Sequence, residues 1–452
     1  MVLIDPVYHR TANLCDHYLQ PRPGSDIAIA LAVARLLLEN DWCDPGAATY
    51  CDHLDRFREL AFSRSIQEWA RLADLRAAEI ERLAEMYADG PSAILVGWGM
   101  QRRARGSSTI RVLDAMGAIS GNLGIPGGGV NFSSRWQGRF DLSFLKGAAA
   151  APRTIPEPLL GPGILEASDP PIRMVWVTAA NPVAMLPESL TVARALQSRE
   201  LTVVVDAFLT DTARCAHVVL PTTTLLEDDD LLGSYGHHWI AESQGVVPPP
   251  PEVKTDYQIL QALAPRVGLG DEFTEDAESW KRRMLQRTAD HGGSLDDVRR
   301  GPVRDPLAAK ILFADRKFAT RSGRVNLIHD VYIEPPVPPA ERPLLLMALS
   351  TSKAQASQWL PGTQQGPATA IVHPAAAPGF ADGDRARLES EIAELPVLIK
   401  FDDRQRKDVV LMEKGGWLRT GRCANTLVKA RVTDAGGCAV YYDTPVRILH
   451  AE

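Results

Sequence analysis

The sequence predicts an α/β protein with doubly wound sheet domains, followed by a C-terminal all-β barrel. The run of β-branched residues from Thr202 to Val205 is typical of a strand buried on both faces. A strand at 174–177 and a helix at 190–197 precede it, which gives the strand–helix–strand unit of a parallel sheet. Beyond residue 344, short alternating strands separated by turn signals favour a barrel.

Length and charge narrow the class of protein. The 452 residues are enough for several domains, and a net charge of -7 without any basic run argues against a nucleic-acid partner. The longest apolar stretch, Ile27 to Leu38, is interrupted by Arg35 and is too short to span a bilayer directly. The amino end carries no signal peptide and begins within a predicted strand. We therefore expect a missing upstream portion, and a cytoplasmic location, or a periplasmic one if an upstream signal exists.

The six cysteines are scattered and form no C-x-x-C pair. This spacing predicts neither a zinc ribbon nor an iron–sulfur cluster in this chain, and no metal ligand is assigned. Small buried thiols are the expected role.

Three domains are expected along the chain. Residues 1–136 form an α/β cofactor-binding domain, with a strand ending at Asp5, a helix at 27–40 capped by Ser25 or Asp26, an amphipathic helix within 73–90 and a short buried strand at 93–96. Residues 137–340 form a second α/β cofactor-binding domain that is an incomplete half. After a proline-rich linker, residues 341–452 form the barrel.

Asp206 is the first candidate for ligand binding. It closes the predicted strand at 202–205, and open α/β sheets bind ligands outside the carboxyl ends of their strands. A carboxylate there can accept two hydrogen bonds from a guanine edge or from ribose hydroxyls. Phe208 and Thr210 follow directly. The alternative is a carboxylate that only closes a turn or caps a helix.

Further candidates suit a dinucleotide. Glycines allow backbone amides to approach a diphosphate, carboxylates accept the guanine N–H groups, and amides can bond pterin or guanine edges both ways. Each has a structural alternative as a turn, a cap or, for the tryptophan, a core residue. The residues are Gly97, Gly99, the run 127–129, Asp26, Asp206, Asp256, Asn181, Asn425 and Trp417.

Several short motifs follow one another along the chain: IDP at 4–6, PGSD at 23–26, GWGMQ at 97–101, GNLGIPGGGVN at 121–131, AANP at 179–182, DAFLTDTARCAHVVLP at 206–221, KTDYQI at 254–259, SGRVNL at 322–327 and GGWLRTGRCANTLV at 415–428. In this order they resemble one family, the molybdopterin oxidoreductases of the dimethyl sulfoxide reductase type. Val7 stands where that family usually has Arg, and His217 where it usually has Asp. The resemblance covers nearly all of this chain.

The resemblance implies a catalytic chain carrying molybdenum or tungsten on a bis-molybdopterin guanine dinucleotide cofactor, with a barrel of double-psi type. It implies two-electron chemistry of the formate dehydrogenase, or the oxyanion, S-oxide or N-oxide reductase, kind on a small-molecule substrate. Arg135 is the implied catalytic residue, with Arg139 competing for that role. His237 and His238 line a substrate funnel or are only loop residues. The implied cofactor-binding residues are Asp5, Asp26, Gly97, Gly99, Gln101, Asn181, Asp206, Phe208, Thr210, Asp256, Trp417 and Asn425.

The family usually begins with a four-cysteine domain for a [4Fe–4S] cluster and a protein ligand to the metal, and neither motif is found in this sequence. Little turnover is therefore expected of the chain alone. One alternative is a non-catalytic cofactor-binding module completed by a separate cysteine-rich iron–sulfur or electron-transfer subunit. The other is an inactive remnant.

Overall fold

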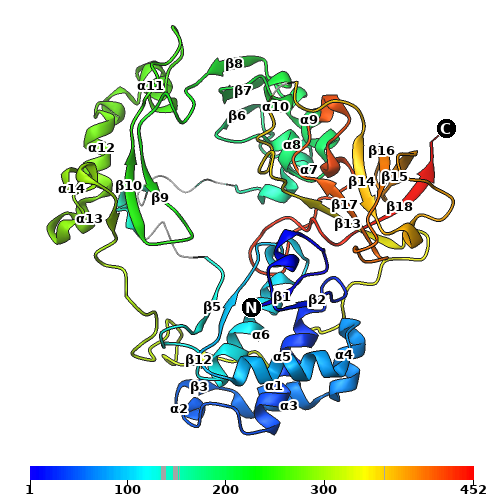
Figure 1. The fold of residues 1–452 in the computed structure, drawn as a ribbon. Helices are drawn as coiled ribbons and strands as arrows, with labels where there is room; N and C mark the ends of the chain where they lie inside the picture. Colours follow the sequence, from blue (N-terminus) through cyan, green and yellow to red (C-terminus); the bar gives the residue numbers. More distant parts are fainter. Residues whose placement is uncertain (134–138, 146–150, 152, 361, 452) are drawn as a thin grey trace.

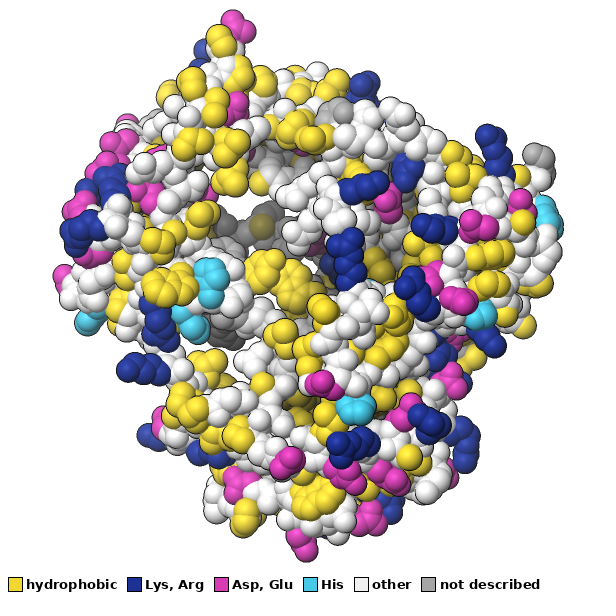
Figure 2. All heavy atoms as spheres, viewed as in Figure 1, with side chains coloured by type: hydrophobic (Ala, Val, Ile, Leu, Met, Phe, Trp, Pro, Cys, Tyr) yellow, Lys and Arg dark blue, Asp and Glu magenta, His cyan; other side chains and the backbone are white. Residues whose placement is uncertain are grey.

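The computed structural model describes residues 1–133, 139–145, 151, 153–360 and 362–451 (Figure 1). Four groups of elements surround a central region, and the space-filling view shows that this face is hollowed between them (Figure 2). None of the helices in the described ranges has the length and apolar content needed to cross a membrane.

The first group is a helical layer built around α1 (Asp26–Glu39). This helix is apolar along most of its length, so other helices cover it on several sides, and its core includes the fully buried Leu31 and Leu37. The covering helices are α3 (Leu54–Phe62), α4 (Ile66–Ala73), α5 (Ala77–Ala88) and α6 (Gly106–Ile119), with the short α2 (Ala47–Tyr50) beside them.

The strands of this first group form parallel pairs instead of one wide sheet. The predicted strand near residue 94 is present, but the side chain of Leu95 is 87% exposed, so the expectation that this strand is buried was wrong. The pairs are β1 (Val2–Ile4) with β2 (His17–Leu19), β4 (Ala93–Leu95) with β5 (Gly129–Asn131), and β3 (Cys51–Asp52) with β12 (Val325–Asn326).

The second group is a three-stranded parallel sheet in the order β6-β7-β8. The central strand β7 (Leu201–Asp206) is buried from Thr202 to Val205, as its β-branched sequence predicts. Since all three strands run the same way, their carboxyl ends meet at one edge. The outer strands are β6 (Met174–Thr178) and β8 (Val218–Pro221), and the helices are α7 (Leu160–Glu166), α8 (Pro182–Met185), α9 (Ser189–Gln197) and α10 (Asp211–Arg214).

The third group is an antiparallel sheet covered by helices, which the sequence did not predict as a separate unit. Its core contains Phe140, Leu231 and Ile240. Its members are β9 (Asp230–Gly233), β10 (Trp239–Ser243), β11 (Val303–Arg304), α12 (Ala277–Met284), α13 (Gln286–Thr288) and α14 (Leu295–Arg300), while α11 (Asp256–Leu263) leads from the parallel sheet toward it (Figure 1).

The fourth group is a closed six-stranded barrel in the order β13-β17-β14-β16-β15-β18. Alternate residues of β16 point into its core, which is the pattern that predicted strands here. The strands are β13 (Leu344–Leu349), β14 (Ala368–Val372), β15 (Arg385–Glu389), β16 (Glu394–Phe401), β17 (Val409–Glu413) and β18 (Thr444–His450).

The predicted fold class, mixed α/β followed by a closed β-barrel, is therefore confirmed. The domain limits at 136 and 340 stay a prediction. One segment near the second limit packs with the first group, because β12 pairs with β3 and Leu327 and Ile328 lie in the core around α1.

Candidate functional site

The carboxyl edge of the parallel sheet gathers polar side chains from three strands and one helix. Asp256 begins α11, which Thr255 caps through its side chain. The Asp256 carboxylate accepts a hydrogen bond from the hydroxyl of Thr178, the last residue of β6. Its second oxygen accepts one from Thr222 at 2.8 Å, directly after β8. Asp256 therefore bridges both outer strands at the edge where β7 ends.

Asp206, the last residue of β7, closes the turn that follows it. Its carboxylate accepts the backbone N–H of Phe208 at 2.9 Å and the hydroxyl of Thr210 at 3.4 Å. Burial raises the pKa of Asp206, and the nearby charge of Asp256 also raises it. The turn role considered from the sequence is thus present, and the carboxylate also lies at the strand edge where a nucleotide would bind.

After Asp206, Thr210 has a structural role, whereas Phe208 is exposed at the surface. Thr210 is the N-cap of α10 and accepts the backbone N–H of Ala213, while the side chain of Phe208 is 43% exposed. Asn181 precedes α8, and its side-chain oxygen accepts the hydroxyl of Thr212 at 2.7 Å. Of the three predicted residues Phe208, Thr210 and Asn181, only Phe208 has a large solvent-exposed side chain.

Two aspartates lie in the first group. Asp5 accepts the backbone N–H of Val7 at 2.8 Å and lies 3.4 Å from the His9 ring, and burial raises its pKa. Asp26 is the first residue of α1, and burial raises its pKa against the opposing effect of Arg103. The Ser25 side chain bonds the carbonyl of Arg22, so it does not cap α1.

The loop after β4 carries Gly97, Gly99 and Gln101. A side chain at Gly97 would meet no neighbouring atom within 4 Å, whereas one at Gly99 would contact the ring of Tyr442. Gln101 lies in a short 3-10 helix, Met100–Arg102. The next residue, Arg103, forms a buried 2.7 Å ion pair with Asp443, so this loop is fixed to the end of the barrel sequence.

Trp417 and Asn425 occupy barrel loops that face the parallel sheet. Trp417 is only 3% exposed, and the Arg419 guanidinium lies 3.9 Å from the centre of its ring. Asn425 is buried and donates to the carbonyl of Ala184 at 3.0 Å. One face of the tryptophan is therefore already covered by a cation.

Asp211, which was not predicted from the sequence, joins the sheet domain to the barrel. Its buried carboxylate accepts the backbone N–H groups of Leu418 at 2.6 Å and of Arg419 at 3.4 Å. The Arg419 guanidinium also lies 3.5 Å from it. Its position in the DAFLTDTAR motif was the only indication in the sequence that Asp211 matters. The sequence does not show that its hydrogen-bond partners are Leu418 and Arg419, about two hundred residues later.

Arg135 lies outside the described residues. Arg139 is described, is buried, and donates to the carbonyl of Ser234 at 2.6 Å.

The His237 ring accepts the backbone N–H of Trp239 at 3.1 Å, and burial lowers the pKa of His238. These histidines belong to a loop that also carries Tyr235, whose ring centre is 4.4 Å from that of Trp98 beside Gly97. The loop therefore reaches the glycine loop of the first group.

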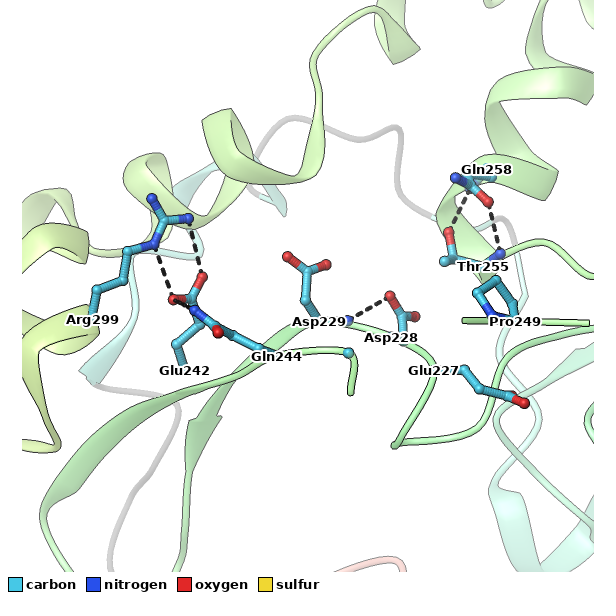
Figure 3. A pocket seen from close by; sticks show the side chains of 10 residues that line it. Glu227, Asp228, Asp229, Glu242, Gln244, Pro249, Thr255, Gln258 and Arg299 are labelled. Carbon is cyan, nitrogen blue, oxygen red and sulfur yellow. Dashed lines mark hydrogen bonds and ion pairs between the residues drawn. The ribbon is translucent and has the colours of Figure 1, made fainter. Parts of the chain in front are cut away.

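A separate cavity of about 470 Å³ lies between the antiparallel sheet and α11 (Figure 3). Four of its ten lining residues are acidic and one is basic, and Glu242 there pairs with Lys281 at 2.9 Å and Arg299 at 3.0 Å. This lining disfavours an anionic cofactor. Its residues are Glu227, Asp228, Asp229, Glu242, Gln244, Gly245, Pro249, Thr255, Gln258 and Arg299.

The hydrogen-bond donors and acceptors between the parallel sheet, the glycine loop and the barrel fit a phosphate-bearing guanine cofactor better than the cavity beside α11 does. Asp206 and Asp256, at the edge of the parallel sheet, are acceptors of the kind that bond guanine N–H groups, and Arg102 and Lys414 are cations of the kind that bind phosphate. The buried indole N–H of Trp417 has no acceptor within the described ranges. An acceptor-rich ligand at the seam between the barrel and the α/β domains agrees with these features.

The strand-edge carboxylates and the glycine loop lie in one region that a family model matches, and most of the terminal barrel lies in another. Residues 1–266 match the family model described as molybdopterin oxidoreductase, and residues 349–445 match the model described as molydopterin dinucleotide binding domain. The chain belongs to the molybdopterin oxidoreductase family. The predicted family, its enzyme class and a molybdopterin dinucleotide as its cofactor are thereby confirmed.

Curated relatives agree with this assignment. The chain is 28% identical to a probable oxidoreductase, YyaE, of Bacillus subtilis, over 100% of this chain and 72% of that protein. It is 27% identical to a dimethyl sulfoxide/trimethylamine N-oxide reductase of Rhodobacter capsulatus, over 92% of this chain and 61% of that protein. It is 26% identical to formate dehydrogenase H of Escherichia coli, over 62% of this chain and 43% of that protein.

A solved structure supports the fold. Acetylene hydratase from Pelobacter acetylenicus superposes with a TM-score of 0.83 at 19% identity, covering 100% of this chain and 74% of that one. The chain spans less than two thirds of the length of several curated relatives, including the reductase of Rhodobacter capsulatus and formate dehydrogenase H.

Proposed function

We propose that this chain holds a bis-molybdopterin guanine dinucleotide carrying molybdenum or tungsten, and serves as a catalytic chain in two-electron redox chemistry on a small molecule. The observation that carries the proposal is the pair of carboxylates at the strand edge, Asp206 and Asp256, in a chain of this family. When bound, such a cofactor supplies the redox chemistry, and the protein holds and tunes it.

The residues of this chain would bind and orient the cofactor. Asp256 is held in place by Thr178 and Thr222, and Asp206 by the turn at Phe208, so both acceptors are fixed before a guanine arrives. Preorganised acceptors lose little conformational entropy when the ligand binds. Asp211 holds the barrel loop at Leu418 against the same sheet, which closes the ligand region from the barrel side.

The proposed substrates are formate, an oxyanion such as nitrate, or an S- or N-oxide. The test is expression in a host that makes the guanine dinucleotide cofactor, followed by metal analysis and assays with each substrate. Bound metal with turnover supports a catalytic chain. Bound metal with turnover only after addition of a cysteine-rich companion chain supports the cofactor-binding module. A folded protein that never binds metal or guanine nucleotide contradicts the proposal and favours an inactive remnant.

Absence of an iron–sulfur cluster from this chain stays a prediction. The free cysteines of the structure are dispersed, and the described residues contain no group of three or more His, Cys, Asp or Glu side chains suited to a metal ion. Iron and acid-labile sulfide analysis of the purified protein tests it.

A further inference from the structure

Two cations from distant parts of the sequence converge on one aromatic ring where the barrel meets the first α/β group. Lys414 follows β17, and Arg102 ends the short helix after the glycine loop. The Lys414 amino group and the Arg102 guanidinium each lie 6.0 Å from the centre of the Tyr441 ring. Lys414 is only 8% exposed.

Two carboxylates near this ring in sequence, Glu413 before Lys414 and Asp443 two residues after Tyr441, already have other partners. Asp443 pairs with Arg103 at 2.7 Å and accepts the Ala104 N–H, and Glu413 pairs with Arg422 at 2.7 Å. Within the described ranges, neither Lys414 nor Arg102 forms an ion pair with a carboxylate, and the Arg102 side chain donates to the hydroxyl of Tyr442 at 3.1 Å. A buried cation without a counter-charge is costly.

Backbone hydrogen bonds fix Arg102 beside the tyrosine whose ring both cations approach. The carbonyl of Arg102 accepts the N–H groups of Tyr441 at 3.0 Å and Tyr442 at 3.2 Å. Burial, followed by the charge of Arg102, lowers the pKa of Lys414 to about 8. The fold therefore brings two like charges to one ring, close enough for Arg102 to lower the pKa of Lys414, and a bound anion would relieve this repulsion.

We propose that Lys414 and Arg102 form the binding site for the diphosphate of the dinucleotide cofactor. This inference rests on the proposed function and deepens it by assigning the anionic part of the ligand. An arginine fork and a lysine point charge both suit phosphate oxygens. Gly97, on the same loop as Arg102, leaves open space beside its backbone, and Lys414 lies inside the matched dinucleotide-binding region. A small substrate anion is the competing occupant.

The experiment compares three variants of the full chain. Lys414→Met removes the charge and keeps an unbranched side chain, Lys414→Arg keeps the charge, and Lys407→Met removes an exposed lysine of the same barrel as a control. Binding of inorganic pyrophosphate, GDP, nitrate and formate is measured by calorimetry. Guanine nucleotide per chain is measured after expression with the cofactor.

Lys414→Met is expected to weaken pyrophosphate binding at least about tenfold, which corresponds to about 1.4 kcal/mol, and to lower guanine content. Lys407→Met should bind pyrophosphate like the wild type, and Lys414→Arg should retain part of the affinity. Because removal of an unpaired buried charge does not destabilise the apo fold, the melting temperature of Lys414→Met should equal or exceed that of the wild type, so lost binding cannot be ascribed to unfolding.

Equal pyrophosphate affinity and equal guanine content in wild type and Lys414→Met would overturn the inference. So would a wild type that binds no pyrophosphate or GDP, or one that binds nitrate or formate more tightly than pyrophosphate through Lys414. If the wild type lacks the cofactor after expression but binds pyrophosphate through Lys414, the proposed function fails while the diphosphate site stands.

Discussion

Asp256 and Thr222 are joined by a 2.8 Å hydrogen bond that fixes the start of α11 to the residue after β8. The same carboxylate accepts the hydroxyl of Thr178 at the end of β6. Asp256 thereby lies close enough to Asp206, at the end of the intervening strand β7, to raise its pKa. The candidate site is organised around these two carboxylates.

Asp256→Asn should lower the pKa of Asp206, because it removes a neighbouring negative charge while leaving an oxygen that can still accept a threonine hydroxyl. Carbon-13 NMR titration of the Asp206 carboxyl group measures the shift. Asp271→Asn, at an exposed carboxylate of the same part of the chain, is the control and should leave it unchanged. An Asp206 pKa that does not move in Asp256→Asn would show that the two carboxylates are not coupled.

Two substitutions of Asp206, to Asn and to Ala, should distinguish its role in the turn from a role in binding the nucleotide. The asparagine oxygen can still accept the Phe208 N–H, so Asp206→Asn should keep its stability, whereas Asp206→Ala should lose about 1–2 kcal/mol. Both should retain guanine dinucleotide at least about tenfold less tightly, since the charged acceptor is gone. Chemical denaturation and released GMP are the two readouts. If Asp206→Asn retains as much guanine dinucleotide as the wild type, Asp206 only stabilises the turn and does not bind the nucleotide.

These carboxylates also show how far the sequence could predict the site. The strand before Asp206 was predicted because four consecutive apolar or β-branched residues leave a clear local pattern. That Asp256 would bond to threonines after two other strands was not predictable, since those contacts depend on the register of the parallel sheet.

The barrel was predicted from alternation along each strand, but its contacts with the rest of the chain were not. The burial of Lys414 could not be predicted from the sequence, because a single lysine between strands is usually solvated. It is buried near Arg102 only once the barrel has closed. The antiparallel sheet around Ile240 was missed as a separate unit because its strands are short and its helices come from residues much later in the sequence.

Asp211→Ala should loosen the barrel from the parallel sheet. It removes the acceptor of the Leu418 and Arg419 N–H groups, which lie at a part-buried interface, and this loss should cost about 1–3 kcal/mol. Hydrogen exchange should then accelerate at residues 417–421 more than within β7. Asp403→Ala, at an exposed barrel carboxylate, serves as the control. Unchanged exchange at 417–421 would contradict the assigned link.

The stability of the apo protein should depend on pH through Lys414. Its pKa is lowered to about 8 from an ordinary value of 10.5, so between these values the unfolded chain binds more protons than the folded one. The stability of the wild type relative to Lys414→Met should therefore rise as pH increases from about 8 toward 10, by about 2–3 kcal/mol in total. Urea denaturation across this range measures it, and a difference independent of pH would contradict the burial of an unpaired cation.

The central claim, that this chain is a holder of molybdopterin guanine dinucleotide, is tested most directly by the cofactor content of the purified protein. The chain is expressed in a host that makes the cofactor, and molybdenum, tungsten and acid-released GMP are measured per folded chain for the wild type and for Asp206→Asn. The account predicts metal and GMP in a fixed ratio in the wild type and a clear loss of both in the variant. A folded wild type that contains neither metal nor GMP would contradict it.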